Sequence, residues 1–508
     1  MITTAIYNFI DIPNLEFYLD NNIANSPQLL IQIFFNTSDE NYISNIQKTL
    51  HANLPDAHII GTTTDGSIHN AQKDTDKTVI SFTHFEKSQL AHKLFFLSSS
   101  KEQECAKEIC ESLLFENTKV IILFTEALHH DIELLIKEIH QHAPRVILAG
   151  GLAGDNGRLQ KTFVCDNTKY TDRGVVAVSI NSDSLFVHND FNLSWEAVGK
   201  GMTITKCNGN IVHEIDGINP IQRYKDFLGS HTFKKYKHDF LPTVGIEFPF
   251  ILERDGFLVA RVALNRNKNS IIFTGNFQEG DKLHFSFANI EKIRNSGSLL
   301  AKNIHNKPVE TIFVYSCMAR RRFMQENIIH DLEPLSKIAP VSGFYTYGEI
   351  YTTPKTKECL NHTMTLLALS EEQENRCSFQ FYENKIQDEN FETLAALTKL
   401  LQVSSAQEEG RLLLSKDLYW DSKQLQLSYQ DKIIPLSRSK ILLLDLLIQH
   451  KNHAVDAYTI FSYIWGENSK EFNADSVRTL IKKLRKKLPV NLIQNSYGGY
   501  YKLTINPS

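Results

Sequence analysis

Cysteine is scarce in this chain, with seven residues in 508, and no two of them form a Cys-x-x-Cys pair. An odd number at irregular spacing predicts neither a zinc site nor a disulfide framework. The cysteines are Cys105, Cys110, Cys165, Cys207, Cys317, Cys359 and Cys377. We therefore expect a protein of the reducing cytoplasm that binds no metal.

Long apolar runs and targeting signals are missing as well. No uninterrupted apolar stretch approaches the roughly 20 residues of a membrane-spanning helix. The segment that begins at Met1 lacks the charged and then apolar pattern of a signal peptide. Phosphate-loop and dinucleotide fingerprints are also absent. We therefore expect no membrane partner and no cofactor.

The charge is unevenly distributed along the chain. A content of 42% hydrophobic and 22% charged residues is typical of globular domains, and 508 residues suffice for two to four of them. Residues 431–508 contain 12 Lys and Arg against 6 Asp and Glu, a net charge of +6. The whole chain carries −4, which leaves −10 for the first 430 residues. A basic end on an acidic body indicates a nucleic-acid partner for that end alone.

Strand-like apolar runs alternate with helical stretches in the first part of the chain, as α/β layers do. Residues 29–35, 120–124 and 146–150 predict buried strands, and residues 39–50 and 131–142 predict helices. A similar α/β segment follows, introduced by a hairpin with an Asn-Gly turn that suits type I′. The first 375 residues therefore predict a mixed α/β body of two halves.

A polar connection separates this body from the end of the chain. Residues 371–390 are rich in Glu, Gln and Asn, and the apolar residues of 391–401 then fall on one face of a predicted helix. That helix packs on the body or pairs with a second subunit, and residues 404–410 indicate a flexible break. The predicted domains are two halves of the body at 1–200 and 201–375, a helical linker at 376–410 and a last domain at 411–508.

Three helices and a hairpin are predicted in the last domain. Ser437 is placed to cap an apolar helix over 441–448, and a second short helix covers 457–465. A third helix covers about 473–488, and two short strands around a glycine turn follow at 492–503. This order is that of a helix-turn-helix with a wing.

The third helix of the last domain has two contrasting faces. Its apolar face consists of Val477, Leu480, Ile481, Leu484 and Leu488. The opposite face and its margin carry Arg478, Thr479, Lys482, Lys483, Arg485, Lys486 and Lys487. A cationic face is often only a solvated surface, but in a helix-turn-helix it enters the major groove and neutralises phosphates.

The run from about 412 to 503 resembles the winged-helix effector domain of OmpR-type response regulators. The matching residues are Pro435-Leu436-Ser437, Leu442-Leu443-Leu444, Val455-Asp456, Ile464-Trp465-Gly466, Val477-Arg478, 481–488 and Gly498-Gly499-Tyr500. The resemblance implies a winged helix that binds duplex DNA through the cationic face and through Tyr497 and Gly498 of the wing. The family usually has an arginine where Tyr497 stands, and a tyrosine can hydrogen-bond a phosphate but supplies no charge. No receiver domain is found.

Small residues gather at the ends of predicted strands in the body. In the first half they include Gly61, Thr62, Thr63, Gly151, Gly154 and Asp155. In the second half they are accompanied by Ser316, Cys317, Arg320, Gly343, Phe344 and Glu349. Glycine-rich turns expose backbone N–H groups that can hold an anion, although turn glycines more often serve backbone geometry alone.

A catalytic role can also be considered for Cys317. Together with His362 and Glu349 it could form a nucleophile, a base and an orienting carboxylate. No linear spacing supports that arrangement, and a cysteine at a strand end is usually a small buried hydrophobic residue.

In their order, these motifs resemble the FIST sensory domain, with its N-terminal and C-terminal halves, over residues 27–369. They include Gly61-Thr62-Thr63, Gly150-Gly151, Gly154-Asp155, Trp195, Asp216-Gly217, Ser316-Cys317, Arg320, Gly343-Phe344 and Gly348-Glu349-Ile350. The resemblance implies a sensor of a small ligand, for which amino acids are the usual proposal. The implied ligand site consists of Gly61, Thr62, Thr63, Gly151, Gly154, Asp155, Ser316, Cys317, Arg320, Gly343, Phe344 and Glu349. Arg320 and Glu349 would then hold the ligand carboxylate and ammonium, or form an internal salt bridge instead. Arg321 and Arg322 follow Arg320 directly, so the sequence does not determine which of the three arginines faces inward.

Together these features predict a one-component transcriptional regulator that is not an enzyme. A ligand bound by the body would change how two winged helices are presented to paired half-sites on duplex DNA, as a homodimer on DNA would require. Two alternatives remain open at the level of sequence. One is an enzyme body that acts through Cys317 and is tethered to DNA, and the other is a constitutive DNA-binding protein whose body mediates assembly.

Overall fold

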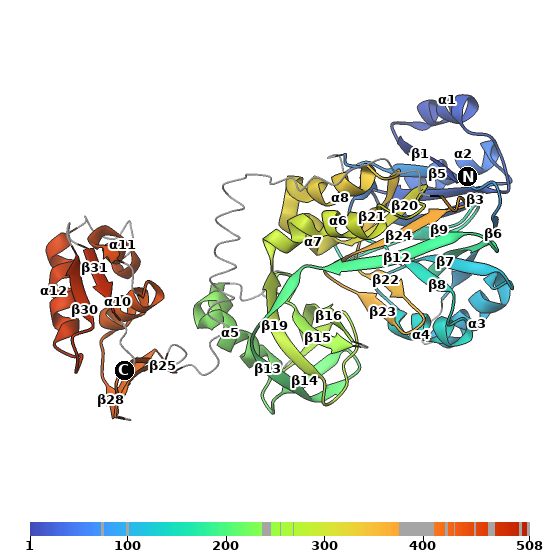
Figure 1. Ribbon diagram of the computed structural model, residues 1–508. Helices are drawn as coiled ribbons and strands as arrows, with labels where there is room; N and C mark the ends of the chain where they lie inside the picture. The colour runs from blue at the N-terminus through green and yellow to red at the C-terminus, as the bar shows by residue number, and fades with distance from the viewer. Residues whose placement is uncertain are drawn as a thin grey trace. The chain divides into compact units, whose positions relative to one another are not determined.

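The computed structural model describes residues 1–72, 76–97, 101–235, 245–254, 256–267, 269–374, 411–421, 425–430, 432–451, 454–465, 473–496 and 500–504. The chain divides into two units, Met1–Gln402 and Val403–Ser508, which we call the body and the effector domain (Figure 1). The predicted linker helix at 391–401 lies outside the described residues. None of the described helices combines the length and the apolar character needed to cross a bilayer.

Sheet A of the body contains six strands, five of them from the first 165 residues. Their spatial order is β1 (Thr3–Asn8), β5 (Val79–His84), β2 (Leu29–Phe35), β3 (His58–Thr63), β9 (Val164–Cys165) and β10 (Tyr170–Thr171). β2 and β3 run parallel because helix α2 (Glu40–Asn53) crosses between them. Helices α1 (Ile12–Asn22) and α2 cover the outer face, so β2 is buried on both sides and its sequence is apolar almost throughout.

Sheet C of the body contains strands from both halves. Their spatial order is β23 (Lys357–Leu360), β22 (Glu349–Thr352), β8 (Ile147–Leu152), β7 (Thr118–Thr125), β11 (Gly174–Asn181) and β6 (Gln89–Phe96). Helices α3 (Glu102–Leu113) and α4 (Ile132–His142) cover its outer face with their apolar sides. Residues of the second half therefore complete a sheet that the first half begins.

Sheet B shows the reverse exchange. Its spatial order is β12 (Phe186–Leu193), β24 (Thr363–Ser370), β20 (Thr311–Cys317), β21 (Val341–Thr346) and β4 (Ser67–His69). Helices α6 (Ile290–Ile304), α7 (Met318–Met324) and α8 (Ile329–Ser336) lie over its outer face (Figure 1), and the short 3-10 helix η2 (Gln325–Ile328) joins the last two. β4 of the first half thus pairs with β21 of the second.

The inner faces of the three sheets meet in one core. Phe34 of sheet A stacks on Phe344 of sheet B at 5.5 Å between ring centroids. Phe124 of sheet C packs edge-on against the same Phe344 ring at 5.3 Å. The body therefore has helices on the outside and three sheets packed face to face inside, which confirms the predicted mixed α/β class.

A fourth sheet stands beside this core. Its spatial order is β16 (Phe257–Arg261), β15 (Phe250–Arg254), β19 (Lys282–Ala288), β13 (Trp195–Asn208), β14 (Ile211–Ile215), β18 (Ser270–Phe273) and β17 (Ala263–Asn267). Helix α5 (Pro220–Lys235) packs next to β14. The predicted hairpin is present as β13 and β14, and the predicted domain boundary at residue 200 falls inside β13.

The effector domain combines two small sheets with three helices around one core. A four-stranded sheet that was not predicted precedes the helices, in the order β25 (Arg411–Ser415), β26 (Leu418–Asp421), β27 (Gln426–Tyr429) and β28 (Lys432–Ile434). The helices are α10 (Arg438–Gln449), α11 (Ala457–Trp465) and α12 (Ala474–Arg485). The last sheet is β29 (Ala454–Asp456), β31 (Tyr500–Leu503) and β30 (Ile493–Ser496), which confirms a winged helix-turn-helix.

Candidate DNA interface and sensor site

Helix α12 presents the cationic face predicted for DNA contact. Its N-cap is Asn473, whose side chain accepts from the backbone N–H of Asp475 at 2.8 Å and of Ser476 at 3.3 Å. Such a cap satisfies donors that have no partner within the helix. The side chains that anchor the helix in the core are Val477, Leu480, Ile481 and Leu484.

The predicted contact residues of α12 and of the turn after it face solvent. Arg478, Thr479, Lys482, Lys483, Lys486 and Lys487 are all exposed. Arg478 forms an ion pair of 2.9 Å with Asp475, and both side chains are more than half exposed. Because an exposed ion pair contributes little stability, a phosphate can replace Asp475 as the partner of this guanidinium at small cost.

Arg485 differs from its cationic neighbours. Its guanidinium donates to the carbonyl oxygen of Ile493 at 3.1 and 2.9 Å and to Oδ1 of Asn495 at 2.7 Å. These bonds tie the last turn of α12 to strand β30 of the wing hairpin. The predicted wing contacts Tyr497 and Gly498 lie outside the described residues.

In the body, the predicted motifs meet where strands of sheets A, B and C end. The N–H of Gly154 donates to the carbonyl of Thr63 at 2.9 Å, which joins the ends of β8 and β3. Asp65 and Gly66 exchange backbone hydrogen bonds of 2.9 and 2.8 Å with Tyr345 of β21. Segments far apart in the sequence therefore form one polar region at these strand ends.

The predicted glycines of this region serve close packing. A Cβ on Gly61 would lie 2.6 Å from the Cys165 sulfur, and one on Gly154 would lie 2.6 Å from the backbone nitrogen of Asp65. Gly343 has a φ of 154°, and a Cβ there would lie 1.8 Å from the carbonyl oxygen of Val314. At these positions a larger residue would push strands apart.

Other predicted residues of the site are also enclosed by protein. Phe344 is part of the central core, Thr62 and Thr63 are buried, and a Cβ on Gly151 would lie 2.9 Å from Cγ2 of Thr346. Ser316 is 1% exposed at the end of β20. These motif residues therefore pack against neighbouring protein atoms at the strand ends.

Asp155 is held by a ring of donors. Its carboxylate accepts from the backbone N–H of Leu159, Gln160 and Lys161 at 2.7 to 3.0 Å and from the hydroxyl of Tyr347. Burial alone would raise its pKa, but the bonds from Tyr347 and from these amides hold the pKa of Asp155 below its usual value. Asp155 is therefore ionised at neutral pH.

Arg320 points into the protein. Its guanidinium forms an ion pair of 2.7 Å with Asp331 and donates to Ser296 at 2.6 Å and to Ser194 at 3.1 Å. Both charged side chains are almost fully buried. The internal salt bridge considered for Arg320 thus exists, but its partner is Asp331 of α8 and not Glu349.

The next two arginines turn toward Asp65. Nη2 of Arg322 lies 3.0 Å from Oδ1 of Asp65, and Nη1 of Arg321 lies 3.5 Å from Oδ2. The side chain of Asp65 is fully buried, whereas those of Arg321 and Arg322 are 20% and 41% exposed. Asp65 was not among the predicted ligand residues, although it lies within the first glycine motif. Arg321 and Arg322 were left open beside Arg320, and of the three only Arg320 is fully buried.

Glu349 sits in a separate buried pocket of hydroxyl groups. It accepts from Oγ1 of Thr346 at 3.1 Å and from Oγ1 of Thr363 at 2.6 Å. Burial raises its pKa to about 8 against the opposing effect of these hydrogen bonds. Glu349 is therefore mostly a neutral acid at pH 7.

The residues considered for nucleophilic catalysis lie in unreactive surroundings. Burial raises the pKa of the Cys317 thiol far above its usual value, which disfavours the thiolate that a nucleophile needs. His362 shares a hydrogen bond of 2.6 Å with the carbonyl of Ile246, and burial lowers its pKa to about 4. In the described part of the chain, no three side chains are grouped to hold a metal ion.

A surface hollow of about 550 Å³ lies elsewhere, near the junction of β12 and β13. It is lined by Phe191, Asn192, Leu193, Trp195, Glu196, Ala197, Leu258 and Lys292. Lys292 and Glu196 form an ion pair there. None of the predicted ligand residues lines this hollow.

Three domain families match the chain in sequence. Residues 30–218 match the FIST N domain and residues 220–352 match the FIST C domain. Residues 430–503 match the domain described as transcriptional regulatory protein, C terminal. The resemblances inferred from the motifs are confirmed by these matches.

Individual relatives are similar to the last domain. The regulatory protein VanRB of Enterococcus faecalis (strain ATCC 700802 / V583) is 40% identical over 72 residues, which span 14% of this chain and 31% of that protein. The DNA-binding domain of CpxR from E. coli is 21% identical over 19% of this chain and 96% of its own, with a TM-score of 0.17. The DNA-binding domain of RstA from Klebsiella pneumoniae, solved in complex with the RstA box, is 22% identical over 17% of this chain and 91% of its own, with a TM-score of 0.16.

Proposed function

Because the chain combines a FIST N domain, a FIST C domain and an OmpR-type DNA-binding domain in that order, we propose that it is a one-component transcriptional regulator. In this proposal the body binds a small ligand and the effector domain binds duplex DNA in a sequence-specific manner. The observation that carries the proposal is the solvent-exposed cationic face of α12 on a capped helix. A helix of this kind fits the major groove.

The residues of α12 divide into two groups by position. Thr479, Lys482 and Lys483 lie in the early and middle turns, where a docked helix faces base edges. Lys486 and Lys487 follow the last turn and are better placed for backbone phosphates. Base-edge contacts select the sequence, whereas phosphate contacts position the protein.

The charged group at the strand ends supports a ligand site in the body. Asp65 supplies a carboxylate, and Arg321 and Arg322 supply guanidinium groups that reach solvent. Such a pair of opposite charges suits a small zwitterion such as an amino acid, because its ammonium and carboxylate groups would exchange with the existing ion pairs. Arg320 is less suited to this role, since its side chain is fully buried, whereas those of Arg321 and Arg322 are partly exposed.

DNA binding is tested with the full chain by binding-site selection, followed by titration of the selected duplex at several salt concentrations. We expect a steep loss of affinity with salt, because five exposed cationic side chains lie in this stretch, namely Arg478, Lys482, Lys483, Lys486 and Lys487. Lys483→Ala should relax the preference at one or two positions, whereas Lys487→Ala should weaken binding to all duplexes about equally. Affinity independent of salt would contradict the phosphate contacts, and a changed sequence preference for Lys487→Ala alone would contradict the docking.

Ligand binding is tested by a thermal-shift screen of amino acids and other small metabolites on the full chain. A ligand that binds only the folded state raises the melting temperature of the body. Arg322→Ala should remove that shift while the unliganded body still melts cooperatively. If no metabolite raises the melting temperature, the constitutive DNA-binding alternative is favoured.

A further inference from the structure

One buried carboxylate makes several of the hydrogen bonds that hold the last described residues of the body, and Gln373 adds one to the carbonyl of Ser184 at 2.7 Å. Glu371 follows the end of β24 directly, and the described part of the body stops three residues later. Beyond that point the chain continues toward the effector domain. The side chain of Glu371 is nevertheless only 1% exposed.

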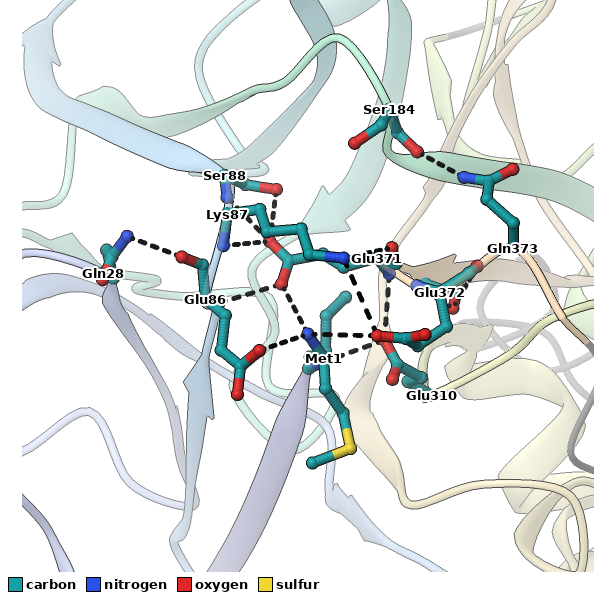
Figure 2. Close-up of polar contacts among 12 residues, drawn as sticks. Met1, Gln28, Glu86, Lys87, Ser88, Ser184, Glu310, Glu371, Glu372 and Gln373 are labelled. Atoms are coloured by element: carbon teal, nitrogen blue, oxygen red, sulfur yellow. Dashed lines mark hydrogen bonds and ion pairs between the residues drawn. The ribbon is translucent and has the colours of Figure 1, made fainter.

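Figure 2 shows Glu371 at the centre of a group of donors from the turn between β5 and β6. Its Oε2 accepts from the N–H of Glu86 at 2.9 Å. Its Oε1 accepts from the N–H of Lys87 at 3.0 Å and from both the N–H and the hydroxyl of Ser88 at 2.7 Å. We call this set of bonds the Glu371 clasp.

The clasp lies where all three sheets of the body meet. The turn at residues 85–88 leaves β5 of sheet A and enters β6 of sheet C, while Glu371 continues β24 of sheet B. Glu310, labelled in Figure 2, lies just before β20 of sheet B. Its carboxylate accepts from the N–H of Ile2 and of Glu371, both at 2.9 Å. A rotation of one sheet against the others would therefore change the distances between Glu371 and the turn at residues 85–88.

The hydrogen bonds of the clasp are of a kind that can break together. Hydrogen bonds to a carboxylate are strong but weaken steeply when distance or angle departs from the optimum. Four of them run from the turn to one side chain, and the amino group of Met1 adds a fifth at 3.2 Å, so a small displacement of the turn disrupts the four together. Burial raises the pKa of Glu371, but the Ser88 hydroxyl and the amides of the turn hold it below its usual value, so the carboxylate is ionised at neutral pH.

We propose that the Glu371 clasp couples the body to the effector domain. Asp65 and Arg322 lie at the opposite ends of these strands from the clasp, so a ligand bound there acts through the length of the sheets. Its binding tilts the sheets, which shifts the β5–β6 turn against β24, and the clasp opens. The chain that leaves the body is then released from the turn, which changes how the effector domain is presented to DNA. This inference rests on the proposed regulatory function. It assigns the coupling between ligand binding in the body and DNA binding by the effector domain to the carboxylate of Glu371.

The proposal is tested by hydrogen exchange of the full chain, with and without a duplex obtained by binding-site selection on that chain. Linkage is reciprocal, so DNA bound by the effector domain must alter the clasp in the body. We expect DNA to change the exchange rates of the Glu86, Lys87 and Ser88 amides about fivefold or more in the wild type. In Glu371→Gln the same amides should exchange about tenfold faster without DNA and no longer respond to it.

Glu372→Gln is the matched control, because it removes the same charge from the next residue, whose carboxylate is no closer than 3.7 Å to Met1 or Lys87. Its exchange rates should follow the wild type. Wild-type amides that do not respond to bound DNA would overturn the coupling while leaving the regulatory function intact. Failure to select any duplex would overturn the regulatory function instead. If both variants lost the response, charge alone and not the clasp would be responsible.

If Glu371→Gln failed to fold, Ser88→Ala would replace it. That variant removes one of the four bonds and leaves the carboxylate and its charge in place. It should show a smaller acceleration of the same amides and a weaker response to DNA. An unchanged response in a folded Ser88→Ala protein with accelerated amides would also overturn the coupling.

Discussion

Three consecutive arginines occupy two different environments in the body. Each residue of α7 turns the side chain by about 100° around the helix axis. Arg320 consequently enters the core and pairs with Asp331, whereas Arg321 and Arg322 are partly exposed and reach the buried Asp65. The sequence alone could not assign these roles, because Asp331 and Asp65 lie on elements whose positions follow from the tertiary fold.

This difference predicts different costs for removing each arginine. Arg320→Ala should lower the free energy of unfolding of the body by about 3–5 kcal/mol, because Asp331 would stay buried without its partner. Arg322→Ala should cost at most about 1 kcal/mol, since its side chain is partly solvated and Arg321 still faces Asp65. Urea unfolding of the two variants measures both values, and equal losses would contradict the assignment.

The neutral Glu349 predicts a dependence of stability on pH. Its pKa is raised from 4.5 in the unfolded chain to about 8 in the folded one. The folded state thus holds this proton more tightly, so the associated stability is complete below pH 4.5 and is lost as the pH rises through about 8.

Glu349→Gln should remove that dependence, because an amide cannot ionise. We expect the melting temperature of the variant, relative to the wild type, to rise by at least about 2 °C between pH 6 and pH 8.5. Thermal melts over this range check the prediction. A constant difference between the two proteins would show that Glu349 is ionised throughout.

At the scale of single elements, the sequence predicted some parts of the effector domain closely. Helix α11 covers the predicted residues, but α12 ends at Arg485 and not at Leu488. The four strands β25 to β28 were missed because strands of three to five residues are too short for a clear alternation. In the body, the β13–β14 turn was predicted as type I′, but only Gly209 has a positive φ, at 57°.

The bonds between Arg485 and strand β30 predict that this residue positions the wing and does not contact phosphates. Arg485→Ala should weaken DNA binding about tenfold while the slope of log affinity against log salt stays unchanged. Lys487→Ala, which removes the same charge two residues later, should lower that slope by about one. A lowered slope for Arg485→Ala would instead show that its guanidinium leaves Ile493 and binds the DNA.

At the scale of the whole molecule, the two halves of the body form one structure. β4 of the first half completes sheet B, and β22 and β23 of the second half complete sheet C. The sequence could predict strands and helices for each half, because those depend on local patterns. It could not predict this exchange, since the partners of a strand are set by packing between distant segments.

This arrangement predicts two unfolding transitions in calorimetry of the full chain. The body should melt as one cooperative unit in spite of its two matched domains, and the effector domain, with its own core, should melt separately. A bound duplex should raise only the transition of the effector domain, and Arg320→Ala should lower only that of the body. Separate melting of residues 1–200 and 201–375 would contradict a single cooperative body.

The strand exchange also has a consequence for synthesis on the ribosome. Glu86 and its partner Glu371 are 285 residues apart, so the turn emerges long before the residue that fastens it. At about 5–20 residues per second, the nascent chain waits roughly a quarter of a minute to a minute for that partner. Meanwhile the inner faces of sheets A and C lack the strands that will cover them, and we expect chaperones to bind the exposed apolar surface during translation.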